Sequence, residues 1–214
     1  MPTELEVYTQ IYDRLREAKY VGIGSGRTVK NFICHMPTEL KQQIVCVPTS
    51  HDTKLELIQG GFQVSELLAV PQSLDFVIDG FDAIVDRNVA IKGGGGCMTW
   101  EKLVALHASK YYLIGGSKKV NPKEIVIPVE VLPLALNFVS SRIKEKFGYD
   151  TTVRMGTGKL GPVVTDFGNW IIDLNVLNHK GEALEEVHRK LKMLTGVVET
   201  GIFTLPFDLM IFDS

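Results

Sequence analysis

The first 120 residues alternate between short β-rich runs and segments with helical spacing, and this alternation restricts the fold more than any other feature. The first helical segment, residues 4–18, has one apolar face made of Leu5, Tyr8, Ile11, Tyr12 and Leu15. The strand-like runs that follow are "YVGIGSG", "QIVCVPTS", "DFVIDGFD" and "YYLIGG". The helical segments between them include "TVKNFICHM", "DTKLELIQGG" and "TWEKLVALHASK". This order predicts a parallel sheet with helices on its faces.

The pattern changes from about Pro128 onward, where extended runs precede an amphipathic helix and the strands bracket one or two helices. "GPVVTDFGNWIIDLNVL" leads to the helical "GEALEEVHRKLKML", and a final strand pair follows, "TGVVETGIF" and "FDLMIF". We therefore predict an α/β, Rossmann-like parallel-sheet main domain made of residues 1–127 and about 200–214. A small α+β, ferredoxin-like second domain, residues 128–199, would serve as a lid or in oligomerisation.

Composition excludes several classes of protein for this chain. A net charge of -2 over 214 residues gives no electrostatic case for a nucleic-acid partner. No apolar run reaches the length of a membrane span, and the N-terminal residues lack the pattern of a secretory signal or transit peptide. Cys34, Cys46 and Cys97 form no metal-binding spacing, and the five histidines are scattered. We expect a cytoplasmic protein with reduced thiols, no metal and no membrane partner.

"VGIGSGRT" places three glycines at a strand-to-helix junction. It is not the dinucleotide motif G-x-G-x-x-G, because Val29 stands three residues after Gly26, and it lacks the Gly-Lys-Ser/Thr of a P-loop. Free backbone N–H groups at a helix N-terminus, beside Ser25, Arg27 and Thr28, suit a phosphate or carboxylate. The alternative is a tight turn that serves geometry alone.

Two aspartates, Asp79 and Asp82, follow the hydrophobic strand in "DFVIDGFD". Ligands of open α/β sheets bind at the carboxyl ends of the strands, so both are candidate site residues. Helix capping and turn formation are the alternative, since aspartate serves both routinely.

The stretch "IKGGGGCMTWEK" holds four consecutive glycines, Gly93, Gly94, Gly95 and Gly96, between Lys92 and Glu101. A flexible linker would normally carry serines and other polar residues, whereas this run lies between an apolar residue and a predicted helix start. Glycine at successive positions indicates a close approach of the backbone to a ligand, with N–H groups donating. Glu101 alone would also be explained by the helix dipole, which favours an acid in the first turn.

Taken together, these motifs resemble those of the A-type ribose-5-phosphate isomerases, over nearly the whole chain. The resemblance is carried by "GIGSGRT", "PTS" (residues 48–50), "DGFDAIVD", "IKGGGGCMTWEK", "GGSKKV", "PVEVLPLA", "TDFGNWIIDL" and "LTGVVETGIF". It implies interconversion of ribose 5-phosphate and ribulose 5-phosphate through an enediolate, in the non-oxidative pentose phosphate pathway. It also implies no metal or organic cofactor, and a homodimer or homotetramer.

The resemblance assigns a role to each candidate residue. Glu101 would be the base that moves the proton between the two carbons. Lys92 and the N–H groups of the glycine run would stabilise the oxyanion. Asp79 and Asp82 would assist ring opening and hold sugar hydroxyls. The phosphate would rest on Ser25, Gly26, Arg27, Thr28 and Lys118.

Some positions depart from the family pattern, namely Phe81, Ala83 and Phe167, and no lysine occurs in residues 1–17. Arg27 would replace the missing lysine's charge, while the other three would alter the walls around the sugar.

The departures leave open an isomerase of another aldose phosphate. A non-catalytic sugar-phosphate sensor and an amino-sugar phosphate deaminase are further alternatives, although the chain shows no DNA-binding segment and His107 is expected to be packed rather than catalytic.

Overall fold

The computed structural model describes residues 1–71, 73–158, 160–177 and 181–213. The chain forms two compact units. The first comprises Met1–Phe81, Trp100–Lys119 and Leu205–Ser214, and the second comprises Asp82–Thr99 and Val120–Thr204. Residues 82–99 and 120–127 thus group with the second unit, whereas the sequence analysis assigns them to the main domain.

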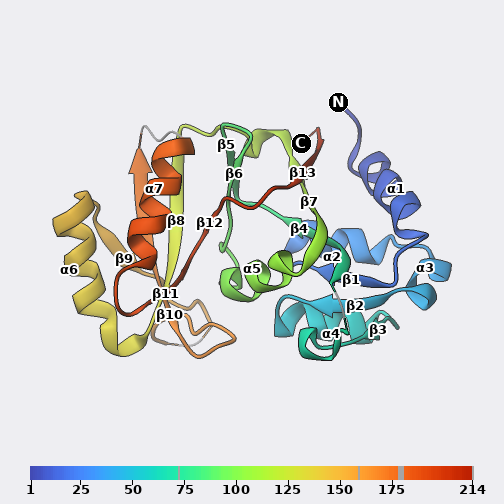
Figure 1. Ribbon diagram of the computed structural model, residues 1–214, viewed down its shortest axis with the longest axis horizontal. Helices are drawn as coiled ribbons and strands as arrows, with labels where there is room; N and C mark the ends of the chain where they lie inside the picture. The colour runs from blue at the N-terminus through green and yellow to red at the C-terminus, as the bar shows by residue number, and fades with distance from the viewer. Residues whose placement is uncertain (72, 159, 178–180, 214) are drawn as a thin grey trace. The chain divides into compact units, whose positions relative to one another are not determined.

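The first unit is built on a six-stranded sheet in the order β13-β7-β4-β1-β2-β3, and every neighbouring pair is parallel (Figure 1). Its strands are β1 (Tyr20–Ile23), β2 (Val45–Pro48), β3 (Gln63–Val64), β4 (Leu74–Gly80), β7 (Ala108–Gly116) and β13 (Asp208–Phe212). The predicted parallel sheet is confirmed. The order reverses between β1 and β4, and in such sheets a ligand crevice forms outside the carboxyl ends of the strands at this switch point.

Helix α1 (Glu4–Leu15) precedes the first strand. The helices between strands are α2 (Arg27–Cys34), α3 (Thr38–Gln43), α4 (His51–Gln59) and α5 (Met98–Leu106), with short 3₁₀ turns η1 (Leu67–Ala69) and η2 (Ser117–Lys119). A capping box starts α1, because Thr3 Oγ1 accepts the Glu6 N–H and Glu6 Oε2 accepts the Thr3 N–H.

Two predictions about the helices were wrong in detail. Leu5 is 56% exposed rather than on the buried face, and the predicted helix of residues 99–110 ends at Leu106, since β7 begins at Ala108.

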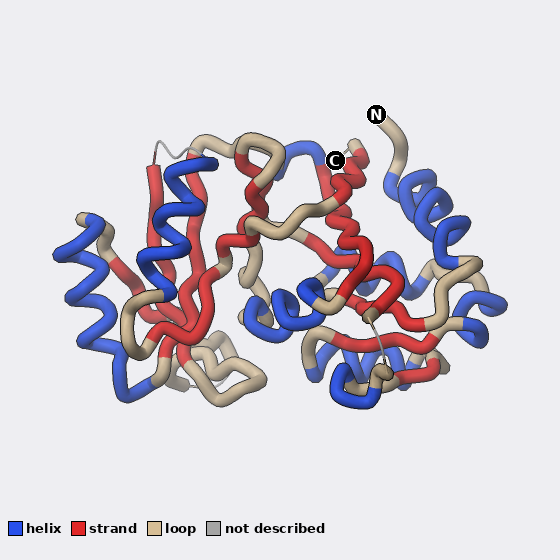
Figure 2. The backbone as a smooth tube through the Cα atoms, in the orientation of Figure 1, coloured by secondary structure: helices blue, strands red, loops and turns tan. Residues whose placement is uncertain are grey.

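The second unit contains a four-stranded antiparallel sheet in the order β11-β8-β10-β9, together with two helices (Figure 2). These elements are β8 (Glu124–Val131), β9 (Thr151–Val153), β10 (Trp170–Leu177), β11 (Val197–Thr200), α6 (Leu136–Phe147) and α7 (Gly181–Lys192), with η3 (Pro133–Ala135) before α6. Buried apolar side chains of β8 and β10 share one core with those of α6 and α7. The unit is therefore α+β, as predicted.

A second, three-stranded sheet in this unit has the order β12-β6-β5 and is formed by β5 (Ala83–Val85), β6 (Val89–Ile91) and β12 (Ile202–Phe203). The predicted final strand pair does not form. Instead, β11 pairs with β8, β12 with β6 and β13 with β7. In the described part of the chain, no helix has both the length and the apolar character needed to cross a membrane.

Candidate active site

The predicted phosphate loop lies at the carboxyl end of β1 and opens α2. Gly26 is the N-cap residue and has a φ of 91°, a left-handed conformation that suits glycine. Arg27 is the first residue of α2 and is exposed, and Thr28 is half-buried. The loop therefore presents the positive end of a helix, with an adjacent guanidinium, at the predicted ligand edge of the sheet.

A chain of hydroxyl groups holds this loop from the side of β2 and α4. Ser25 Oγ lies 2.9 Å from Thr49 Oγ1 and 3.0 Å from Ser50 Oγ. Thr53 donates its hydroxyl to the Gly24 carbonyl at 2.9 Å. Thr49 and Ser50 are fully buried, at 0% and 1% exposure. The "PTS" segment thus supports Ser25, and Thr53 is a supporting residue that the sequence analysis did not single out.

Asp79 joins the phosphate loop to the end of β4. Its Oδ1 accepts the N–H groups of Ser25 at 3.2 Å and Gly80 at 2.7 Å. The loop passes so close that a Cβ at Gly24 would lie 1.9 Å from this oxygen, so only glycine fits there. Two groups of predicted site residues, Ser25–Thr28 and Asp79, are therefore brought together at the switch point of the sheet.

Lys118 lies at the same edge of the sheet, in the 3₁₀ turn that follows β7, and its side chain is exposed. The neighbouring Lys119 instead contacts Phe81. It donates to the Phe81 carbonyl at 2.7 Å, and its Nζ lies 5.7 Å from the centroid of the Phe81 ring. Lys118 is thus the lysine that remains suited to a ligand contact.

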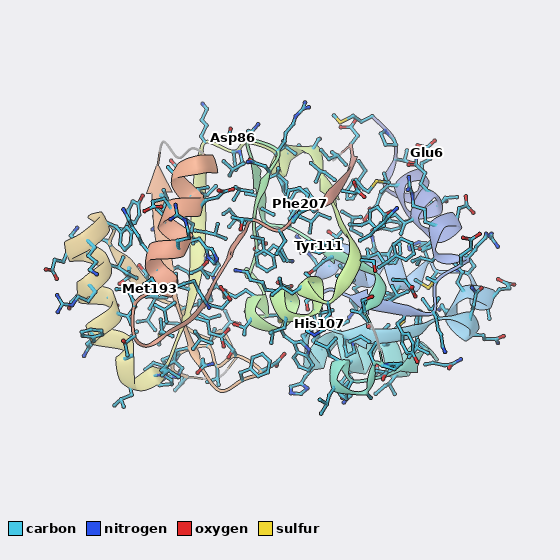
Figure 3. The ribbon with its side chains drawn as sticks, viewed as in Figure 1. Glu6, Asp86, His107, Tyr111, Met193 and Phe207 are labelled. Carbon is cyan, nitrogen blue, oxygen red and sulfur yellow. The ribbon has the colours of Figure 1, made fainter. Side chains whose placement is uncertain are left out.

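Glu101 occupies the first turn of α5 and is 4% exposed. Trp100, the residue before it, meets the ring of His51 edge-on, with centroids 5.3 Å apart. His107 follows the end of α5, where its Nδ1 lies 2.8 Å from the Leu103 carbonyl oxygen, and it is exposed (Figure 3). The expectation that His107 is packed was therefore wrong, because the helix ends one residue before it.

The glycine run forms a tight loop in the second unit. Gly93 and Gly96 have φ angles of 101° and 81°, and Gly96 N–H donates to the Gly93 carbonyl at 3.0 Å. Asp82 Oδ2 accepts the Gly94 N–H at 2.7 Å, and the Asp82 side chain is exposed. A Cβ at Gly95 would meet no atom within 4 Å. The structure thus brings Asp82 and the glycine run together.

Lys92 enters this loop from β6 and is buried, at 3% exposure. Its N–H donates to the Gly201 carbonyl at 2.9 Å, and its Nζ lies 5.5 Å from the centroid of the Phe203 ring. A Cβ at Gly201 would lie 2.1 Å from the Lys92 carbonyl oxygen, so glycine is required there as well. The "TGIF" segment therefore fixes the backbone from which the lysine side chain starts.

Sequence analysis missed three polar residues that support this region. Arg154 donates to the Gly93 carbonyl at 2.7 Å and also bonds Asp173. Glu130, 1% exposed, accepts hydrogen bonds from the side chains of Thr99, Thr165 and Asn169. Glu130 and Asp173 stand inside motifs quoted for the resemblance, whereas Arg154 lies outside them and next to no segment that the sequence predicted as a strand, so no sequence signal pointed to it.

Two of the departures from the family pattern have structural explanations. The Phe81 ring packs on β7, where a Cβ at Gly115 would lie 2.7 Å from it, and Phe81 is 3% exposed. Ala83 is 5% exposed and belongs to the second unit's core. Both side chains are therefore committed to packing within their own units. Phe167, by contrast, is 49% exposed.

In the described residues, no three or more His, Cys, Asp or Glu side chains gather in a way that could hold a metal ion. The candidate residues consist instead of carboxylates, a buried lysine, hydroxyls and backbone N–H groups. Groups of these kinds can each bind an anion, move a proton or stabilise an oxyanion.

Comparison with known proteins places the chain in a family. The family model described as ribose 5-phosphate isomerase A (phosphoriboisomerase A) matches residues 45–214. The ribose-5-phosphate isomerase of Homo sapiens is 38% identical over 203 residues, covering 90% of this chain but only 64% of the human protein. The chain therefore spans less than two thirds of that relative's length.

Solved structures agree. The ribose 5-phosphate isomerase A of Methanocaldococcus jannaschii has a TM-score of 0.87 at 30% identity, over 97% of this chain and 93% of that one. A D-ribose-5-phosphate isomerase in complex with phospho-erythronic acid also has a TM-score of 0.87, at 27% identity over 97% and 93% of the two chains. From the sequence match and the shared fold, this chain belongs to the ribose 5-phosphate isomerase A family.

Proposed function

We propose that this protein is an aldose–ketose isomerase that interconverts D-ribose 5-phosphate and D-ribulose 5-phosphate. The observation that carries the proposal is the hydrogen bond between Ser25 and Asp79, because it sets the N-terminus of α2 beside a carboxylate at the switch point of the sheet, which supports an anion site there. The match to the family model begins at residue 45, after the phosphate loop of residues 25–28. The support for a phosphate site in this loop is therefore the geometry of the loop itself. The relative in complex with phospho-erythronic acid supports a sugar phosphate as the substrate.

The phosphate would bind at the start of α2. Ser25, Gly26, Arg27 and Thr28 offer backbone N–H groups, hydroxyls and a guanidinium, and Lys118 adds a second cation at the same edge. A dianionic phosphate is favoured there by the helix dipole and by both charges. This anchoring contributes binding energy remote from the reacting carbons, which the enzyme can use to hold the sugar in the reactive geometry.

Proton transfer is assigned to Glu101. Moving the carbonyl from C1 to C2 needs a base that removes the C2 proton and returns it at C1, and one carboxylate can do both. Glu101 is buried, so water around the carboxylate is scarce and its position is fixed by α5. The C2–H electron pair forms a C1–C2 double bond while the C1=O pair moves to O1, which gives the enediolate. Glu101 then returns its proton to C1, the O2–H proton passes to O1, and the C2 carbonyl of the ketose forms.

Stabilisation of the enediolate oxygen is assigned to Lys92 and to the N–H groups of the glycine run. A buried cation and fixed N–H donors stabilise developing negative charge without reorganisation. Asp79 and Asp82 would open the sugar ring and hold its hydroxyls. No metal or organic cofactor takes part in this scheme.

No specific feature of the candidate residues favours a non-catalytic sugar-phosphate sensor or an isomerase of another aldose phosphate. A sensor has no use for a buried base and a buried lysine, and the side chains of Phe81 and Ala83 are occupied in packing. We further propose a cytoplasmic homodimer or homotetramer, in which residues 128–199 act as lid or oligomerisation element. Exposed apolar side chains at and around η3 support this proposal, namely Leu132, Leu134 and Phe138.

A coupled assay of ribose 5-phosphate conversion in the presence of EDTA tests the activity, with arabinose and allose phosphates as competing substrates. We expect isomerisation of ribose 5-phosphate that is lost by about a thousandfold in Glu101→Gln. Glu145→Gln, on the exposed side of α6, is the matched control and should retain full activity. Absence of isomerisation of any pentose phosphate by the wild-type protein would contradict the proposal.

A further inference from the structure

Arg154 holds the glycine loop by its carbonyl oxygens. Its Nη1 lies 2.7 Å from the Gly93 carbonyl oxygen and 3.1 Å from that of Gly94. Two consecutive peptide groups therefore face the same guanidinium nitrogen. Hydrogen bonds from a charged donor are stronger than neutral ones, so this contact fixes the orientation of both peptides.

Asp173 holds the arginine in turn. Its Oδ2 accepts from Arg154 Nε at 2.8 Å, and its Oδ1 accepts from Nη2, which is the side-by-side pairing that a planar guanidinium favours. In the β9–β10 ladder Asp173 lies opposite Thr152, two residues before Arg154, so the two side chains share one face. Their side-chain exposures are 18% and 20%, which limits screening by water.

The backbone of Arg154 is equally fixed. Its N–H donates to the Ile171 carbonyl at 2.9 Å, and its own carbonyl accepts the Val163 N–H at 2.8 Å. The guanidinium therefore projects from a rigid base toward a loop made of glycines, which have little conformational preference of their own.

The orientation of the carbonyls determines where the N–H groups point. A trans peptide is planar, so its C=O and N–H bonds point in opposite directions. The Gly93 carbonyl faces Arg154, and the Gly94 N–H on the other side of that peptide reaches Asp82 at 2.7 Å. By the same geometry, the Gly94 carbonyl faces Arg154 and the Gly95 N–H points away from it. Gly95 itself is exposed.

We propose that Arg154, braced by Asp173, is a positioning residue that holds the Gly94–Gly95 peptide with its N–H toward the substrate oxygen that becomes negative. Glycine on both sides of this peptide allows it to rotate, and a rotated peptide would present its carbonyl oxygen instead. A carbonyl would repel the oxyanion that an N–H stabilises. The kinetic part of this inference rests on the proposed isomerase activity.

The kinetic experiment compares Arg154→Met, Arg154→Lys and Asp173→Asn with Arg142→Met. Arg142 is the matched control, because it lies in the same unit and pairs with Glu145 on the exposed side of α6. Removing one preorganised donor lowers kcat by about a hundredfold, so we expect a fall of that order in Arg154→Met with KM within about threefold of wild type. The kcat of Arg154→Lys should be higher than that of Arg154→Met but below wild type. The kcat of Asp173→Asn should lie between those of Arg154→Lys and the wild-type protein.

Two outcomes of this assay overturn the inference. One is a kcat in Arg154→Met equal to that of Arg142→Met. The other is a loss confined to thermal stability, with full kcat for the folded fraction, which is what a purely structural arginine would give.

A second measurement does not depend on activity. Amide hydrogen exchange followed by NMR reports on Gly94 and Gly96, whose N–H groups are bonded to Asp82 and Gly93. We expect exchange at both to accelerate by about tenfold or more in Arg154→Met and to stay unchanged in Arg142→Met. If the wild-type protein does not isomerise ribose 5-phosphate, the proposed function fails, and this measurement alone decides whether Arg154 orders the loop. Unchanged exchange in Arg154→Met overturns the inference.

Discussion

Oδ1 of Asp79 accepts the backbone N–H of Ser25 at 3.2 Å, so the carboxylate at the end of β4 directly supports the turn at the end of β1. The opposite end of the same strand pair has the same arrangement. There Asp75 Oδ2 accepts the N–H groups of Lys19 at 2.8 Å and Tyr20 at 3.0 Å. One aspartate thus faces the proposed ligand edge, and the other lies at the edge where no site is expected.

This symmetry gives the first prediction. Asp79→Asn and Asp75→Asn both keep an oxygen that can accept the two N–H groups, so both variants should fold with similar melting temperatures. Only Asp79→Asn should lose activity, by about tenfold or more in kcat, because only Asp79 is proposed to act on the sugar. Thermal melts and the isomerase assay of both variants check this. Equal activities would remove Asp79 from the catalytic residues.

Gly95→Ala tests whether the substrate lies against the glycine loop. The φ of Gly95 is not in the left-handed region, and an added Cβ would meet nothing within 4 Å, so the protein itself should tolerate alanine. A bound sugar at this backbone would not, and we expect kcat/KM to fall by about tenfold or more at unchanged stability. Gly158→Ala, another glycine with open space around it, is the control. Full activity in Gly95→Ala would place the sugar elsewhere.

Glu130→Gln should lower the free energy of unfolding, and Glu130 is not proposed to contact the substrate. Glu130 is buried and accepts from Thr165 Oγ1 at 2.7 Å and Asn169 Nδ2 at 2.9 Å, besides Thr99. Glutamine keeps one oxygen that can accept from Thr165 and Asn169, and its new NH2 group can donate to the Thr99 hydroxyl, but all three hydrogen bonds lose the charge of the carboxylate, which costs about 1–3 kcal/mol. Urea denaturation measures the loss, with Glu124→Gln at the exposed start of the same strand as control. Equal stabilities would show that this cluster contributes little.

Stability should fall at alkaline pH. Burial raises the pKa of the Cys46 thiol from 9.0 to about 12, and burial also raises the pKa values of Tyr8 and Tyr12 above 10.0. Between pH 9 and 12 the unfolded chain has lost the Cys46 proton while the folded chain keeps it. The free energy of unfolding is therefore full below about pH 9 and decreases as pH rises toward 12.

Urea denaturation at about pH 8 and about pH 10.5 measures this decrease. Cys46 alone contributes a slope of up to about 1.4 kcal/mol per pH unit, which Cys46→Ala should remove. Cys34→Ala is the control, since Cys34 is exposed. A slope that is the same in both variants would assign the alkaline loss to the tyrosines instead.

The features of the fold and of the candidate site that the sequence predicted are those that depend on local sequence patterns. Strand ends rich in glycine and acid identified Ser25 and Asp79, and a parallel sheet necessarily brings such ends to one edge. Other contacts depend on chain segments far apart. Arg154 meets Gly93 across 61 residues of sequence, and no periodicity predicts that contact. The end of α5 was misplaced because "ASK" suits a helix as well as the strand β7 that it joins.

The hydroxyl chain beside the phosphate loop has a consequence for affinity. Ser25, Thr49, Ser50 and Thr53 restrain one another's rotamers through hydrogen bonds before any ligand arrives. The rotational entropy of these side chains is therefore lost when the chain folds rather than when a phosphate binds. We therefore expect an inorganic phosphate ion, which offers few contacts of its own, to occupy the proposed phosphate loop with measurable affinity and to compete with the sugar phosphate.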